Sequence, residues 1–281
     1  MYAMKINEEP TVPQHGDFEA GLGPVSYEKE AEAALREALK EDRLVVNMQP
    51  TVDLKTGKVV AADLLVRWRR PPGNIEMARG TALLSKKNGL IREIADFMIE
   101  QVCRIIFKWR QEGKPLVPVS INIAEKNMLD KKFVAKVKEQ IKRYNIPPYI
   151  LELTLEEGMG ESEAEELIRS TRSLRRLGIR FAVGDFGTSA FPLKIICKMP
   201  VDVLKMDKDF FDNIHLSEKE RAMLTHIIRL AKSVDMKVRY EGIKTEGQEA
   251  LLKGAGCDLG QGDLYGGPMS EELFQRLLAA Q

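Results

Sequence analysis

Two short apolar runs in the C-terminal half of the chain place the strongest limits on its fold. Arg180–Val183 leads into Asp185, and Val203–Met206 carries Lys205 near its end. Runs that are apolar on both faces are typical of strands in a parallel sheet that is buried on both sides. The carboxyl ends of such strands meet at one edge of the sheet, where α/β proteins place their functional side chains. We therefore expect Asp185 and Lys205 to lie on the same rim.

Short apolar runs alternate with amphipathic stretches over most of the chain. The expected strands are Leu44–Val52, Lys58–Trp68, Val117–Ile123, Ile150–Leu155, Arg180–Val183, Val203–Met206, Lys237–Tyr240 and Cys257–Leu259. The expected helices are Ile91–Gln111, Lys131–Tyr144, Glu161–Leu177, Glu218–Val234, Thr245–Gly254 and Ser270–Ala280. Strands that alternate with helices predict a parallel sheet, either closed as a barrel or open with helices on both faces.

Three observations favour the closed barrel. Only Asp53–Gly57 separates the first two strands, which is too short for a crossover helix, so these strands should pair antiparallel. No Gly-x-Gly-x-x-Gly motif follows an early strand, which weakens the case for an open dinucleotide-binding sheet. Polar residues end successive strands: Arg67, Asn122, Glu152, Asp185, Lys205, Glu241 and Gln261. We predict an α/β fold, a modified (β/α)8 TIM-like barrel with an antiparallel first strand.

The N-terminal segment differs in character from the rest of the chain. Residues 1–25 are polar, contain Gly and Pro, and show no hydrophobic periodicity, so we expect a disordered N-terminal arm. Residues 26–281 are expected to form one barrel domain that begins with a helix over residues 27–40, whose apolar side chains share one face.

Composition restricts the cellular compartment and the kinds of binding partner that we expect. A net charge of +1 gives no electrostatic reason to expect nucleic acid or a membrane surface as the main partner. No apolar run approaches the ~18 residues of a membrane span, and the N-terminus lacks a signal-peptide core. Cys103, Cys197 and Cys257 lack metal-ligand spacing and are expected to be buried free thiols. Together these features predict a cytoplasmic protein.

The polar residues at the strand ends indicate the chemistry of the rim. Carboxylates together with Asn and Gln supply the oxygen atoms that hold Mg²⁺ or Mn²⁺ beside phosphate oxygens. A lysine among them suits binding of a phosphate or orientation of a water nucleophile. Each of these residues alone is as well explained by loop capping or surface ion pairing, but their repetition over consecutive strands predicts a phosphoester site.

The same positions fall within motifs of one known family. The motifs, in chain order, are Met48-Gln49-Pro50, Asp63-Leu64-Leu65-Val66-Arg67-Trp68, Asn88-Gly89-Leu90-Ile91, Ser120-Ile121-Asn122-Ile123, Leu151-Glu152-Leu153-Thr154, Gly184-Asp185-Phe186-Gly187-Thr188, Pro200 to Asp207, Glu241-Gly242-Ile243-Lys244-Thr245 and Gly260-Gln261-Gly262. From Leu44 to Ala280 the chain resembles the EAL-domain family of bacterial cyclic-di-GMP phosphodiesterases. The resemblance implies a barrel with an antiparallel first strand, two divalent metals, and hydrolysis of cyclic-di-GMP to the linear dinucleotide.

The resemblance also assigns roles to individual residues. Asn122 and Glu152 match metal ligands of the family, Asp185 the second aspartate of its Asp-Asp-Phe-Gly motif, and Lys205 the lysine that supports the attacking water. Arg67 is expected on a phosphate. The complete set of ligand-binding positions that the resemblance implies is Gln49, Leu65, Arg67, Asn122, Glu152, Asp185, Lys205, Asp207, Glu241, Lys244, Gln261 and Pro268.

Several departures from the family pattern fall on its catalytic positions. Asp63 stands in place of the signature glutamate, Gly184 in place of the bridging aspartate, and Lys244 in place of a later glutamate. The change to Gly184 adds one positive charge and the change to Lys244 adds two. Like charges 4–6 Å apart repel by several kcal/mol at an effective dielectric constant of ~20, and Mg²⁺ needs nearly complete oxygen coordination.

We therefore interpret the chain as a degenerate member of the family. No catalytic residue is expected to be active, although Lys205 and Glu241 are retained. No cofactor is required, and Mg²⁺ or Mn²⁺ matters only for residual activity. The vestigial metal ligands are Asp63, Asn122, Glu152 and Asp185.

Three functions remain open at the level of sequence. The first is a non-hydrolytic cyclic-di-GMP receptor that signals to an unidentified protein partner, and the second is an interaction domain without nucleotide. The third is a weak phosphodiesterase with one metal held by the vestigial ligands. A homodimer is also plausible, because four aromatic residues lie in a region through which family members pair, although barrel packing explains each of them equally well: Phe186, Phe191, Phe210 and Phe211.

Overall fold

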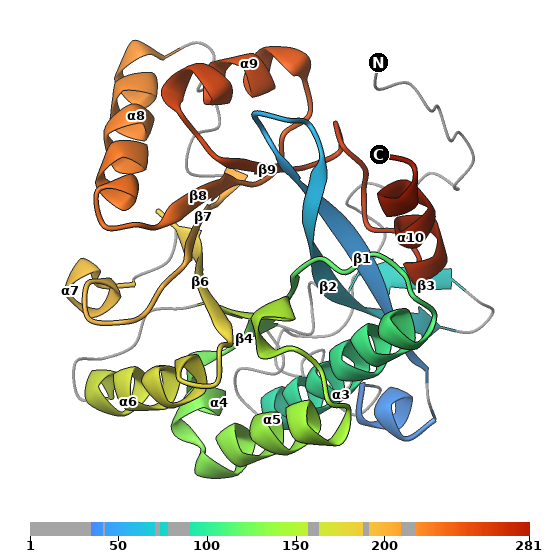
Figure 1. Ribbon diagram of the computed structural model, residues 1–281. Helices are drawn as coiled ribbons and strands as arrows, with labels where there is room; N and C mark the ends of the chain where they lie inside the picture. The colour runs from blue at the N-terminus through green and yellow to red at the C-terminus, as the bar shows by residue number, and fades with distance from the viewer. Residues whose placement is uncertain are drawn as a thin grey trace, which may run out of the picture.

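The chain folds into a closed β-barrel surrounded by helices (Figure 1). The computed structural model describes residues 35–41, 43–70, 74–77, 90–156, 163–187, 191–208 and 217–281. Its strands are β1 (Leu44–Asp53), β2 (Val59–Arg70), β3 (Asn74–Met77), β4 (Val119–Ile123), β5 (Leu151–Leu155), β6 (Arg180–Phe186), β7 (Val203–Met206), β8 (Lys237–Tyr240) and β9 (Leu259–Gln261). The ring runs β1-β9-β8-β7-β6-β5-β4-β2 and closes through the pairing of β1 with β2, while β3 extends the sheet beyond β2.

Helices cover the outside of this ring, as the view along the barrel axis shows (Figure 1). They are α3 (Leu90–Gln111), α4 (Glu125–Leu129), α5 (Lys131–Arg143), α6 (Ala164–Arg175), α7 (Leu193–Ile196), α8 (Glu218–Lys232), α9 (Glu246–Ala255) and α10 (Glu271–Ala279), with a 3-10 turn at Pro148–Ile150. Each longer helix buries one apolar stripe against the barrel, and Trp109 of α3 stacks on Phe274 of α10 with ring centroids 6.0 Å apart. Among the described helices, none is long and apolar enough to cross a membrane.

The first strand runs antiparallel to both of its neighbours, which confirms the prediction from the short connection. The turn after β1 is stabilised by Asp53, whose Oδ1 accepts hydrogen bonds from the Thr56 backbone N–H at 2.8 Å and the Thr56 hydroxyl at 3.0 Å. Gly57 closes the turn with φ 72°, a conformation that favours glycine. The remaining neighbours from β2 round to β9 pair parallel, so their carboxyl ends face one side of the barrel.

The structure corrects several boundaries. β9 is Leu259–Gln261 rather than Cys257–Leu259, because residue 258 still belongs to the connection, where its carboxylate accepts a hydrogen bond from the Val238 N–H at 3.0 Å. The short elements β3, α4 and α7 were not predicted, since each is too brief to show a period. Residues 35–40 are helical, whereas the expected arm and the earlier part of the expected helix lie outside the described residues.

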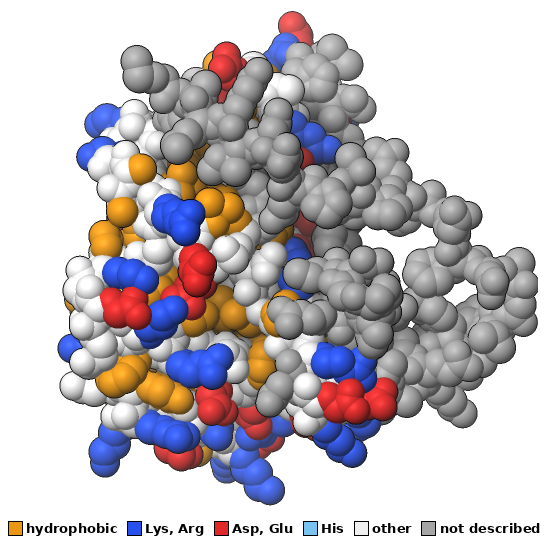
Figure 2. Space-filling view, turned by 90° about the vertical axis from the view of Figure 1, so that its right-hand side faces the viewer, with side chains coloured by type: hydrophobic (Ala, Val, Ile, Leu, Met, Phe, Trp, Pro, Cys, Tyr) orange, Lys and Arg blue, Asp and Glu red, His pale blue; other side chains and the backbone are white. Residues whose placement is uncertain are grey.

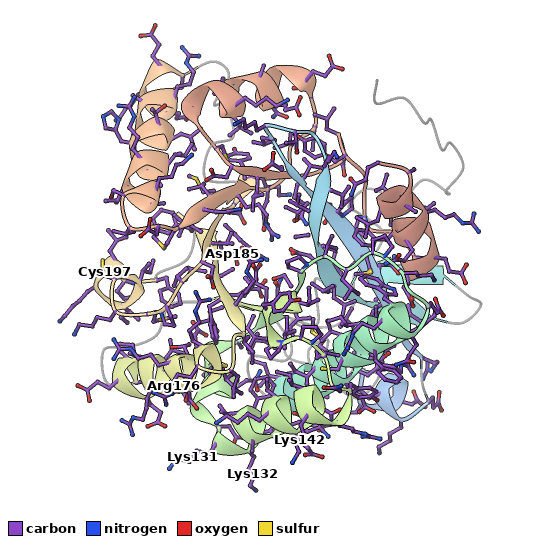
Figure 3. All side chains as sticks on the ribbon, viewed as in Figure 1. Lys131, Lys132, Lys142, Arg176, Asp185 and Cys197 are labelled. Carbon is purple, nitrogen blue, oxygen red and sulfur yellow. The ribbon has the colours of Figure 1, made fainter. Side chains whose placement is uncertain are left out.

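The cysteine prediction holds for two positions and fails for the third. Cys103 and Cys257 are buried free thiols, and burial raises the pKa of each to about 12. Cys197 is exposed beyond the end of α7, at the outer edge of the molecule (Figure 3). Phe191 is buried in the core, which favours barrel packing over a dimer contact for this residue, while Phe210 and Phe211 lie outside the described residues.

The described residues on the face that Figure 2 shows form no extended area of one charge. Lys and Arg side chains there lie among Asp and Glu, with strips of hydrophobic atoms between them (Figure 2). This mixture matches the overall balance of 43 basic and 42 acidic residues.

Candidate functional site: a charge-paired barrel interior beneath an acidic mouth

An ion network crosses the interior of the barrel. Arg239 of β8 donates two parallel hydrogen bonds to Asp63 of β2, from Nη1 to Oδ1 and from Nη2 to Oδ2, both at 2.7 Å. Nη2 also donates to Glu241 Oε1 at 2.8 Å, and Nη1 to the Thr51 hydroxyl at 3.2 Å. Because β2 and β8 are not neighbours in the sheet, these bonds span the space inside the ring. Paired, charge-assisted bonds of this kind are among the strongest hydrogen bonds in proteins.

Lys205 of β7 approaches the same carboxylate from another side. Its Nζ lies 3.2 Å from Asp63 Oδ2 and 3.3 Å from Oδ1, and it donates to the Ser120 hydroxyl at 3.2 Å. That hydroxyl exchanges a 2.7 Å hydrogen bond with the Thr154 hydroxyl. We call Asp63, Lys205, Arg239 and Glu241 the interior network.

Burial and opposite charges control the protonation of Asp63. Asp63 is 5% exposed, and Lys205 and Arg239 are each 1% exposed. Burial alone would raise the pKa of Asp63, but the charges of Arg239 and Lys205 outweigh it and lower the pKa to about 2. Asp63 is therefore ionised at neutral pH, with both oxygens committed to cations.

Carboxylates gather above the interior network, at the strand ends. Asp185 lies near the end of β6 at the mouth of the barrel (Figure 3). Its φ of 49° is rare for a residue other than glycine, and the pairing of β6 with β7 shifts register between Val183 and Phe186. Such an irregularity redirects side chains and is common beside functional sites. Here it presents Asp185 to the mouth.

Four acidic side chains influence one another at this mouth. Burial and, after it, the charge of Asp185 raise the pKa of Glu156, while the charge of Lys205 lowers it by less. The resulting pKa of Glu156 is about 8. Burial likewise raises the pKa of Asp185 to about 6, helped by the charges of Glu241 and Asp207 and by a hydrogen bond to Asp207. We call Glu156, Asp185, Asp207 and Glu241 the mouth carboxylates, with Glu241 belonging to both groups.

Gly184 leaves space that another side chain uses. A Cβ atom built on Gly184 would lie 3.0 Å from the Thr154 methyl group and 3.5 Å from Glu156 Cγ. The side chain of Glu156 thus lies beside the position where an aspartate at 184 would begin. Glu156, which was not among the predicted site residues, comes directly after the end of β5.

The remaining predicted site residues occupy the walls of the barrel. Gln261 of β9 donates to the Thr51 hydroxyl at 3.3 Å, and the backbone of Met269 pairs with Met48, which brings Pro268 beside Gln49. Arg67 is buried in β2, with Nη1 donating to the Val66 carbonyl at 3.1 Å. Three further positions lie on β2, β4 and β5: Leu65, Asn122 and Glu152.

Lys244 lies apart from the predicted site residues in the barrel interior and at its mouth. Its side chain is exposed and makes no hydrogen bond or ion pair within the described part of the chain. Its backbone N–H donates to Gln248 Oε1 at 2.8 Å, where Thr245 and Gln248 cap the start of α9. The second positive charge inside the barrel, beside that of Lys205, comes instead from Arg239, which was not among the predicted site residues.

The alternation of side chains along a strand was a signal in the sequence for Arg239. Alternate residues of a strand point to the same face, so Arg239 and Glu241 should share the inner side of the barrel. Arg239 lies in the strand Lys237–Tyr240, two residues before the predicted site residue Glu241, so its side chain could have been assigned to the barrel interior from the sequence.

The side chains present do not fit the divalent metals that the resemblance implies. Both oxygens of Asp63 accept hydrogen bonds from cations, and Gly184 supplies no carboxylate. Within the described ranges, no group of three or more His, Cys, Asp or Glu residues is arranged to hold a metal ion.

Comparison with known proteins agrees with the fold. The chain is 30% identical to signaling protein YkoW of Bacillus subtilis (strain 168) over 250 residues, which is 89% of this chain and 31% of YkoW. It is 29% identical to cyclic di-GMP phosphodiesterase NbdA of Pseudomonas aeruginosa, over 91% of this chain and 33% of NbdA. The chain thus spans about a third of the length of these curated relatives.

Solved structures and a family model give the same result. The PaMucR phosphodiesterase, determined as a c-di-GMP complex, superposes with a TM-score of 0.81 at 26% sequence identity, over 87% of this chain and 99% of that chain. The model of the EAL domain matches residues 32–268. The chain therefore belongs to the EAL domain family.

Proposed function

We propose that this EAL domain is a receptor for cyclic di-GMP that does not hydrolyse the nucleotide and that signals to a protein partner. One observation carries the proposal: the Asp63 carboxylate is held by Arg239 at 2.7 Å on both oxygens and by Lys205 at 3.2 Å. An anion with two cationic partners has little affinity left for a divalent metal. Lys205, which is committed to Asp63 and Ser120, is not free to orient a water nucleophile.

Nucleotide binding is supported by the walls of the barrel. Family positions that contact the ligand keep polar or charged side chains, including Arg67, Gln49 and Gln261. A guanidinium group can bind a phosphate through two parallel hydrogen bonds, which makes Arg67 the expected anchor. The similar PaMucR structure is a c-di-GMP complex. Binding in this chain would then need no metal cofactor.

A second candidate, an interaction domain without nucleotide, is favoured by a different observation. The mouth carboxylates face the side from which a ligand with two phosphodiester charges would enter, and Lys244 lies in solvent rather than among them. Carboxylates close to a phosphate repel it. The two candidates differ in a single measurable quantity, the affinity for cyclic di-GMP.

Calorimetric titration with cyclic di-GMP in EDTA, and again in MgCl₂ or MnCl₂, separates the candidates. Chromatography of the same samples measures the linear dinucleotide. The receptor predicts binding in EDTA, unchanged by metal, with no product. Absence of binding under all conditions would rule out the receptor and leave the interaction domain as the remaining non-enzymatic candidate. Turnover at the ~1–10³ per second of ordinary enzymes would show an active phosphodiesterase.

A further inference from the structure

Arg239 is the most unusual buried group in the described part of the protein. An arginine that is 1% exposed carries a full charge, and removing such a charge from water costs several kcal/mol unless it is well paired. Four of its hydrogen bonds go to oxygen atoms of Asp63, Glu241 and Thr51. Its Nε is buried without a hydrogen-bond partner in the described residues, so the guanidinium is held by its two terminal nitrogens.

The interior network is electrically neutral with Arg239 in place. The carboxylates of Asp63 and Glu241 contribute two negative charges, and Lys205 and Arg239 contribute two positive charges. Without Arg239, the network would hold the buried Asp63, the half-buried Glu241 and a single cation, Lys205, and so carry one negative charge in excess. A buried carboxylate without a partner either takes up a proton or binds a cation.

The length of the Asp63 side chain matches this arrangement. The N–O distances of 2.7 Å are already short for charge-assisted hydrogen bonds. A glutamate at this position would carry its carboxylate roughly 1.5 Å further along its side chain, into the guanidinium. Asp63 in place of the family glutamate is therefore the substitution that leaves room for Arg239.

We propose that Arg239 is a built-in cation that takes over, inside this barrel, the charge-balancing role of a divalent metal at Asp63. The parent protein then takes up no divalent cation at this carboxylate, and loss of the guanidinium turns Asp63 and Glu241 into a cation-responsive site. This inference concerns the protein without nucleotide, so it stands or falls independently of cyclic di-GMP binding.

The test compares thermal unfolding in EDTA and in millimolar MnCl₂, without nucleotide. The parent should unfold at the same temperature in both. Arg239→Met should unfold at a lower temperature in EDTA and regain on the order of 3 °C in MnCl₂, because a cation that binds only the folded state stabilises it. Arg239→Lys, which keeps the charge, should show no response to MnCl₂.

Two further variants assign the response to its site. Arg239→Met combined with Asp63→Asn should lose the gain in MnCl₂. Arg175→Met makes the same chemical change at an exposed ion pair with Asp202, 2.6 Å in length, and should respond to MnCl₂ as the parent does.

Either of two results would overturn the proposal. The first is an increase in the unfolding temperature of the parent in MnCl₂ that Asp63→Asn abolishes, since Asp63 would then bind metal despite Arg239. The second is a folded Arg239→Met variant that responds no more than the parent. The measurement on the parent and on Asp63→Asn decides the matter even if Arg239→Met does not fold.

Discussion

The interior network and the mouth carboxylates hold acidic groups in opposite ways within one barrel. Asp63 lies between Arg239 and Lys205, and its pKa falls to about 2 despite burial. Glu156 is half-buried near Asp185 and Glu241, and its pKa rises to about 8. The comparison shows that burial alone does not determine the charge of a carboxylate, because the sign of its nearest neighbours decides which form the fold favours.

The two groups therefore affect stability at opposite ends of the pH scale. The pKa of Asp63 is lower in the folded protein than its ordinary 3.8, so its contribution is present above pH 3.8 and is lost as the pH falls through about 2. The pKa of Glu156 is raised from 4.5, so its protonated form stabilises the fold below pH 4.5, and that contribution is lost as the pH rises through about 8.

The largest expected effect comes from removing one side of the interior network. Arg239→Met leaves the buried Asp63 and the half-buried Glu241 with only Lys205 as a cation, and breaking a buried pair in this way costs about 3–5 kcal/mol. Urea denaturation at pH 7 measures the loss in the free energy of unfolding. The control, Arg175→Met, breaks a surface ion pair and should cost less than about 1 kcal/mol.

Replacing Arg239 and Asp63 together shows whether the loss of stability in Arg239→Met comes from the excess negative charge. Arg239→Met combined with Asp63→Leu removes one positive and one negative charge and leaves Lys205 and Glu241, so the interior network keeps a net charge of zero. The double variant should be more stable than Arg239→Met alone. Equal losses in both variants would show that Arg239 acts through packing rather than through its charge.

The next largest effect is expected at the mouth carboxylates, in the pH dependence of the free energy of unfolding. The parent should lose stability from pH 5 to pH 8 as Glu156 ionises next to Asp185, and Glu156→Gln should remove this part of the loss. One unit of pKa shift corresponds to about 1.4 kcal/mol, so we expect a difference on the order of 2 kcal/mol after partial exposure is allowed for. Parallel pH profiles of denaturation for parent and variant would contradict the raised pKa.

The fold could be predicted from the sequence because strand and helix patterns alternate repeatedly along the chain. Alternating strands and helices, together with the short connection Asp53–Gly57, predicted the parallel ring and its antiparallel first strand. Local features without a period were missed, as with α7, which is four residues long. The site was predicted only in part, because its strand-end residues follow a pattern while the pairing of Asp63 with Arg239 across the barrel does not.

An effect of intermediate size is expected at Arg67, which lies on β2 in the wall of the barrel. Arg67→Ala should weaken cyclic di-GMP binding about tenfold or more, since a hydrogen bond to a charged group contributes ~1.5–3 kcal/mol. Calorimetric titration in EDTA measures the dissociation constant, and thermal unfolding of the variant confirms that the barrel is folded. An unchanged constant would place the nucleotide away from β2 and shift weight to the interaction domain.

The smallest effect is expected at Lys244, which the motif alone placed with the nucleotide. The resemblance placed this lysine among the ligand-binding positions, where its charge would offset that of a phosphate. The chain turns after Glu241 through Gly242, whose φ is 77°, and the exposed Lys244 begins the cap of α9. With Arg239 supplying the interior charge, Lys244→Gln should change neither binding nor stability by more than about 0.5 kcal/mol, as is usual for surface positions. A tenfold weaker affinity for cyclic di-GMP in this variant, with unfolding unchanged, would show that Lys244 reaches the ligand and that the mouth is less acidic in the complex than in the free barrel.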